Sequence, residues 1–100
     1  MATRTLVIDE GCDLVGERRQ INTRLTGTNS REESFRLRLH NRKNHAIHVR
    51  VEEILAPYAD WKVLRASEKW TKQDDQTIWF DFDLKPDTEK VVTYTVRYDW

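Results

Sequence analysis

Three histidines stand close together in the sequence and form its densest group of possible metal ligands: His40, His45 and His48. Imidazole nitrogens bind zinc, but a structural zinc site normally takes four ligands in a tetrahedral arrangement. No fourth ligand is evident nearby, so we expect a polar turn at these residues rather than a metal site. We expect no cofactor in the rest of the chain either.

Paired carboxylates are the second group that could do chemistry. Asp81 and Asp83 share one face of a predicted strand, and Asp74 and Asp75 precede them in the chain. Calcium takes six to eight oxygen ligands, usually from a loop that wraps the ion, and no stretch here resembles such a loop. Acid and base catalysis by two carboxylates requires a cleft, which a chain of this length has little material to build. We expect these carboxylates to be solvated.

Cys12 is the only cysteine, which excludes a disulfide within the chain. A catalytic thiol needs a base, and no spacing of cysteine and histidine indicates one. The sequence also lacks a recognisable nucleophile and base pair, a metal-ligand set and a phosphate-binding loop. We therefore expect a protein that is not an enzyme.

The tryptophans are the most informative residues for binding, because four of them occur in 100 residues. Trp79 lies between Ile78 and Phe80, so on a strand it points away from the core that these neighbours fill. An exposed indole can anchor a protein interface or stack on a sugar ring. A loop that carries Trp70 could instead cover it. Trp79 and Trp70 are the candidate contact residues.

The elements that carry these residues are predicted to be strands. Apolar and polar residues alternate with period two, the pattern of a half-buried strand. The pattern is clear in the segments 34–40, 47–52, 78–84 and 92–100 and weaker in 5–8, 14–25 and 61–67. Lys85 to Thr88 reads as a turn. The segment 68–76 has no apolar stripe, and we expect a loop there.

Asn41 to Ala46 links two of the clear strand segments. Asparagine tolerates turn conformations, so Asn41 and Asn44 predict a β-hairpin at this point. A hairpin centred near Asn44 sets the cross-strand pairs, which are His40 with His48, Arg38 with Arg50, and Arg36 with Glu52.

This register predicts a basic stripe on one sheet face, made of Arg36, Arg38 and Arg50 with the two histidines beside them. The stripe could receive an acidic partner. An arginine-rich face is also an ordinary way to keep a sheet solvated, and Glu52 offsets part of the charge.

Length and charge limit the classes of protein. One hundred residues correspond to one domain, spanning 1–100. The 17 basic and 17 acidic side chains give a net charge of zero, without the basic face of a nucleic-acid-binding domain. No apolar run is long enough to span a membrane, and residues 1–9 lack the apolar stretch of a signal peptide.

Short strands without crossover helices favour an antiparallel β-sandwich of about seven strands. We expect the immunoglobulin-like type. The cysteine and tryptophan pattern of antibody domains is absent, so the likeness concerns architecture only.

The amino-acid sequence of several segments resembles that of a known family. These segments are Val15–Gln20, Leu39–Lys43, Val49–Glu53 and Val92–Tyr98. Together they are similar to the C-terminal end of the domain of unknown function numbered 4139, found in bacterial proteins of the mucoidy inhibitor A group. The resemblance covers residues 12 to 100. It implies a β-sandwich at the end of a longer, exported chain, and hence a periplasmic or secreted location, but it implies no reaction.

We therefore expect a non-catalytic module that contacts neighbouring domains of the same protein or another protein. The candidate contacts are Trp70, Trp79 and the arginines 36, 38 and 50. The alternative is a carbohydrate-binding module that uses the tryptophans as stacking platforms.

Overall fold

The computed structural model describes residues 4–8 and 14–100 of the chain, with side chains described from residue 16 onward. The described residues form eight strands and no helix. The strands are β1 (Arg4–Ile8), β2 (Leu14–Gly27), β3 (Ser30–Asn41), β4 (Ile47–Ile54), β5 (Asp60–Ala66), β6 (Trp70–Asp74), β7 (Thr77–Leu84) and β8 (Glu89–Asp99). The all-β prediction is confirmed.

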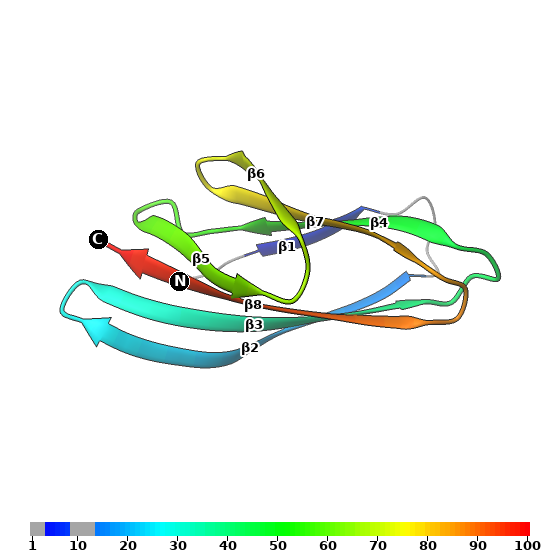
Figure 1. Cartoon of the computed structure of the whole chain (residues 1–100), viewed down its shortest axis with the longest axis horizontal. Coiled ribbons are helices and arrows are strands. Elements are labelled where there is room, and N and C mark those ends of the chain that lie inside the picture. The colour runs from blue at the N-terminus through cyan, green and yellow to red at the C-terminus, as the bar shows by residue number, and fades with distance from the viewer. Residues whose placement is uncertain (1–3, 9–13) are drawn as a thin grey trace.

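Two four-stranded antiparallel sheets pack face to face (Figure 1). The first sheet has the order β1-β4-β7-β6, and the second has the order β2-β3-β8-β5. Alternate side chains of the central strands point between the sheets, as period-two patterning requires. The resulting core contains Phe35, Leu37, Leu39, Val49, Val51, Ile78, Phe80, Val92, Tyr94, Val96 and Tyr98.

The strand order gives the sandwich its immunoglobulin-like character. An immunoglobulin domain places its strands A, B, E and D in one sheet and C, F and G in the other. Here β1, β4, β7 and β6 take the first four places, and β5 and β8 take the places of C and F. The place of G is taken by β3, which comes before β4 to β8 in the chain and forms a hairpin with β2.

The alternating segments of the sequence are found as the central strands β3, β4, β7 and β8, with the predicted residues facing inward. Trp100 is the exception, because β8 ends at Asp99 and the Trp100 side chain is exposed. The weaker segments near 5–8, 14–25 and 61–67 are also strands. The prediction of a loop over 68–76 was wrong, because Trp70–Asp74 forms β6. Its backbone pairs with β7 while its side chains stay mostly exposed, so this edge strand needs no apolar alternation.

The predicted hairpin between β3 and β4 was also wrong. Residues 42–46 carry the chain from the second sheet to the first, so β3 pairs with β2 and β8 while β4 pairs with β1 and β7. The crossing is held by Asn41, which is fully buried. Its side-chain amide donates to the carbonyls of His45, Leu84 and Lys85 at 3.0 to 3.1 Å and its oxygen accepts from the Lys43 N–H. Bonds to the β7–β8 turn replace the local bonds that a hairpin would make.

The two open sides of the sandwich are closed in different ways. On one side, Trp61 of β5 and Trp70 of β6 meet edge to face, with ring centroids 6.3 Å apart. On the other side, Arg18 of β2 reaches across to Glu53 of β4, with its Nε 3.1 Å from the carboxylate. The guanidinium of Arg18 also lies 4.2 Å from the centre of the Phe35 ring.

Glu53 is an acidic residue at an inward position of β4, and none of its surface is exposed. Its carboxylate accepts a hydrogen bond from the buried Tyr94 hydroxyl as well as from Arg18. Burial disfavours the charged form, and it raises the pKa of Glu53 above 4.5 despite these two partners. The same burial and the nearby carboxylate raise the pKa of Tyr94 well above 10.0. Glu53 therefore bridges the two sheets at an electrostatic cost.

Candidate functional site

The outer face of the first sheet carries Trp79, whose outward direction the sequence predicted. Trp79 of β7 points away from the core and is half-buried. Its indole Nε1 donates to the Glu52 carboxylate at 3.1 Å. The Arg50 guanidinium lies over the indole, 3.7 Å from the ring centre. Both partners belong to the neighbouring strand β4, where Glu52 directly opposes Trp79.

A row of ion pairs continues this arrangement along the two strands. Arg50 donates to Asp81 at 2.8 Å. His48 lies between two carboxylates, with Nε2 3.2 Å from Asp81 and Nδ1 3.0 Å from Asp83. These side chains form a ladder of alternating charges that begins at the aromatic ring of Trp79. We call this surface the Trp79 face and define it as Trp79, Glu52, Arg50, Asp81, His48 and Asp83.

The ladder should make His48 titrate above its ordinary range. Hydrogen bonds to Asp83 and then to Asp81 raise the pKa of His48 above 6.5. A raised pKa in the folded state means that this contribution to stability is present below pH 6.5 and is lost as the pH rises through the folded-state pKa. We expect the imidazole NMR titration of His48 to have its midpoint above 6.5 and to move lower in Asp83→Asn. A midpoint unchanged by that substitution would contradict the contact.

Trp70 does not join Trp79. It lies opposite Phe80 in the register, on the inner face, and packs on the core beside Trp61. The Trp61 Nε1 donates to the Asp75 carbonyl at 2.7 Å. These two tryptophans therefore seal the edge of the sandwich, and Trp70 cannot form a common platform with Trp79.

The predicted basic stripe is not formed. Arg36 and Arg38 of β3 lie on the outer face of the second sheet, whereas Arg50 lies on the outer face of the first. The predicted cross-strand pairs depended on a hairpin between β3 and β4. The chain crosses between the sheets at this point, so the arginines of β3 and β4 lie on different sheets. Arg38 pairs with Glu89 at 3.3 Å, and Arg50 belongs to the ladder.

The histidines are separated in the same way. His40 contacts Asp87, His45 contacts Asn44, and His48 belongs to the other sheet. Within residues 4–8 and 14–100 no group of three or more histidine, cysteine or acidic side chains could hold a metal ion. Cys12 lies outside the described residues. The described part of the chain has no helix that is long and apolar enough to cross a membrane.

The outer face of the second sheet carries a feature that the sequence did not reveal. A depression of about 490 Å³ crosses all four strands. Its lining comprises Ile21, Asn22, Ser34, Arg65, Ala66, Ser67, Thr93, Tyr94 and Thr95. Asn22, Ser34, Thr95 and Arg65 form one row across the sheet, one residue from each strand. We call this site the polar depression.

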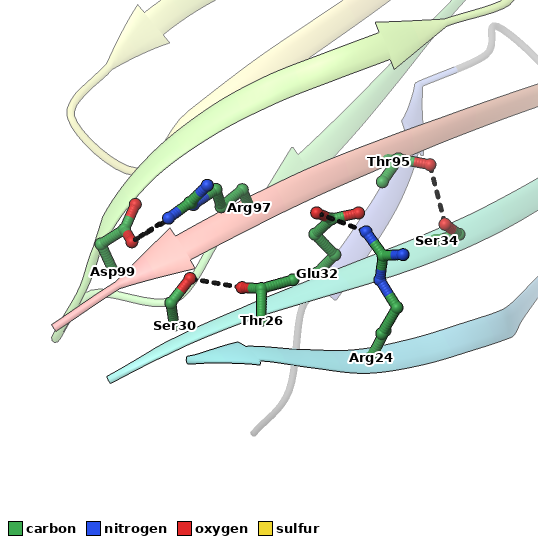
Figure 2. A network of polar contacts seen from close by, with 8 residues as sticks. All are labelled: Arg24, Thr26, Ser30, Glu32, Ser34, Thr95, Arg97 and Asp99. Carbon is green, nitrogen blue, oxygen red and sulfur yellow. Dashed lines mark hydrogen bonds and ion pairs between the residues drawn. The ribbon is translucent and has the colours of Figure 1, made fainter. Parts of the chain in front are cut away.

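Figure 2 shows the surroundings of the polar depression. Ser34 and Thr95 meet at its centre, with their hydroxyl oxygens 2.7 Å apart. Towards the end of the sheet, Arg24 pairs with Glu32 at 3.1 Å and Arg97 pairs with Asp99 at 3.2 Å. Thr26 and Ser30 share a further hydrogen bond.

Comparison of the chain with family models, with curated proteins and with solved structures finds no match. What the domain does must therefore follow from its own residues.

Proposed function

We propose that this domain is a non-catalytic interaction module, which binds a protein partner or a neighbouring domain through the Trp79 face. The resemblance to the domain of unknown function numbered 4139 supports a place in a larger, exported bacterial protein. The observation that carries the proposal is the pair made by Trp79 and Arg50 on the outer face of a sheet. Tryptophan and arginine are the residue types most enriched among the strong contacts of protein interfaces.

The pair is already ordered without a partner. The indole of Trp79 is fixed at its nitrogen by Glu52 and over its ring by Arg50, and Arg50 is fixed in turn by Asp81. Binding loses free energy when side chains must be immobilised, and a pre-ordered pair avoids most of that loss. The core does not require an outward tryptophan, since Ile78 and Phe80 already fill the inner positions on either side.

The carbohydrate-binding alternative receives less support. A sugar ring stacks on an open aromatic face, but Arg50 lies over the face of Trp79. Trp70 is committed to Trp61 and the core. To stack on the face that Arg50 covers, a glycan would have to displace Arg50 and separate it from Asp81. NMR spectra of the four indole N–H groups during addition of a glycan panel test this point, and we expect no selective shift of Trp79.

The binding test uses two matched variants and a partner captured from extracts of the source organism. Trp79→Ala removes the platform, whereas Arg38→Gln removes a charge from the opposite outer face. We expect Trp79→Ala to weaken binding about 30-fold or more, as loss of a strong interface residue does, and Arg38→Gln to leave it unchanged. Equal binding by all three proteins, measured by calorimetry, would overturn the proposal, as would selective binding of a glycan at Trp79.

A further inference from the structure

The polar depression is lined by groups that donate hydrogen bonds. Arg65 contributes a guanidinium, Asn22 an amide, and four serines and threonines contribute hydroxyls. No acidic residue occurs among its lining residues. Guanidinium and hydroxyl groups that converge without a carboxylate are suited to a negatively charged oxygen ligand.

Several of these hydroxyls keep a hydrogen to donate. In the pair formed by Ser34 and Thr95, one hydroxyl donates to the other, so one hydrogen is left over. Ser67 accepts a hydrogen bond from the Thr93 N–H at 2.9 Å, which also leaves its own hydroxyl hydrogen available. Ser34, Thr95 and Ser67 all line the same depression.

Two arginines at this place have no ion-pair partner within residues 4–8 and 14–100. Two acidic residues directly flank the lining, Glu32 two positions from Ser34 and Glu68 next to Ser67. Glu32 is already paired with Arg24 (Figure 2), and Glu68 is paired with Lys90 at 2.6 Å. Arg65 forms no ion pair with any residue that the structure describes. The same holds for Arg36, which opposes Thr93 in the register and so lies beside the depression. The two arginines at and beside the depression therefore favour a negatively charged ligand there.

We propose that the polar depression binds a small molecule through an oxyanion group, a carboxylate or a phosphate. Arg65 forms the charged contact, the hydroxyls of Ser34, Thr95 and Ser67 hold the remaining oxygens, and Arg36 adds to the attraction. The exposed side chain of Ile21 forms an apolar wall for the rest of the ligand. The volume of about 490 Å³ falls within the range of small-molecule sites. The site lies on the opposite sheet from the Trp79 face and does not depend on the function proposed for that face.

The test is an NMR titration of the whole domain with inorganic phosphate and, separately, with acetate. Sodium chloride at equal ionic strength serves as the reference. We expect saturable shifts of the amides of Ser34, Thr95 and Ser67 and of the Arg65 side chain. A response to phosphate alone assigns the site to a phosphoryl group, and a response to acetate alone assigns it to a carboxylate.

Two substitutions locate the charged contact. Arg65→Gln should weaken binding about tenfold or more, because it removes a hydrogen bond to a charged group. Arg38→Gln removes the same charge from the same face but outside the depression, and should leave the affinity unchanged. Ser34→Ala, which keeps Arg65, should weaken binding by a smaller factor. The proposal is overturned if neither anion gives saturable shifts beyond those of chloride, or if the two arginine variants lose affinity equally.

Discussion

Glu53→Ala is expected to lower the free energy of unfolding by about 3 to 5 kcal/mol, the usual effect of removing one partner of a buried ion pair. The carboxylate of Glu53 holds the Arg18 guanidinium and the Tyr94 hydroxyl at the contact between the sheets. Without it, Tyr94 keeps a buried hydroxyl with no acceptor at this place, and Arg18 loses its charged partner. Urea denaturation of the two proteins at neutral pH measures the difference.

Two further variants separate the buried contact from general effects of charge. Glu53→Gln keeps an oxygen that can accept from Tyr94 and should lose less stability than Glu53→Ala. Glu52→Gln changes the neighbouring, half-exposed residue and should change stability by only about 0.5 kcal/mol. A loss below about 1 kcal/mol for Glu53→Ala would show that the carboxylate does not connect the sheets.

The stability of the wild-type protein should also depend on pH through Glu53. Its pKa in the folded state lies above the ordinary value of 4.5. The protonated group therefore favours folding fully below pH 4.5, and this contribution is lost as the pH rises through the folded-state pKa. The side chain introduced by Glu53→Gln cannot titrate. As the pH rises through the folded-state pKa of Glu53, the wild-type protein should therefore lose stability relative to this variant. An opposite trend in a series of denaturation curves would show that Arg18 and Tyr94 outweigh burial.

Asn41→Ala is expected to lower the free energy of unfolding by about 3 kcal/mol or more, because several buried backbone groups lose their partner at once. The side chain of Asn41 holds the carbonyls of His45, Leu84 and Lys85, and it accepts from the Lys43 N–H. It is the link between the crossing at 42–46 and the β7–β8 turn. Thermal and urea unfolding measure the loss.

Asn44→Ala is the matched control for this substitution. Asn44 lies in the same connection but is exposed, and among the described residues its side chain hydrogen-bonds with the neighbouring His45. The change in stability should stay within about 0.5 kcal/mol. If both asparagine variants were equally stable, the crossing would not depend on the bonds made by Asn41.

The central strands could be predicted because each buries one face. Phe35, Leu37 and Leu39 alternate with exposed or half-exposed residues, and a period of two has only one structural interpretation over such a length. The edge strand β6 could not be found in this way. Its polar side chains are mostly exposed, and it is a strand because its backbone pairs with β7.

The pairing of the strands was harder to predict than their positions. Asn41 and Asn44 fit a local hairpin as well as a crossing between sheets, because asparagine tolerates the turn conformations of both connections. The choice depends on bonds from Asn41 to Leu84 and Lys85, which lie on a distant part of the chain. This error carried over to the basic stripe, since Arg38 and Arg50 were placed together only by the hairpin.

The candidate sites were also only partly predictable from the sequence. The outward direction of Trp79 follows from the alternation of side chains along β7. The position of Arg50 over its ring depends instead on the pairing of β4 with β7. The polar depression takes residues from four strands, so no sequence motif marks it. The available signal was the alternation of Thr93 and Thr95 with the core residues of β8. It indicates that both side chains point away from the core, but not what lies beside them.

The most direct test of the proposed function is photo-cross-linking from the Trp79 face in cells of the source organism. A photoreactive amino acid replaces Thr71, which is exposed and opposes Trp79 in the register. A control protein carries it at Lys62, which is exposed on the second sheet. We predict one discrete adduct from position 71, either with a second protein or within the same longer chain, its loss in Trp79→Ala, and no such adduct from position 62. No adduct from position 71, or the same adduct from both positions, would contradict the proposal that the Trp79 face is the docking surface.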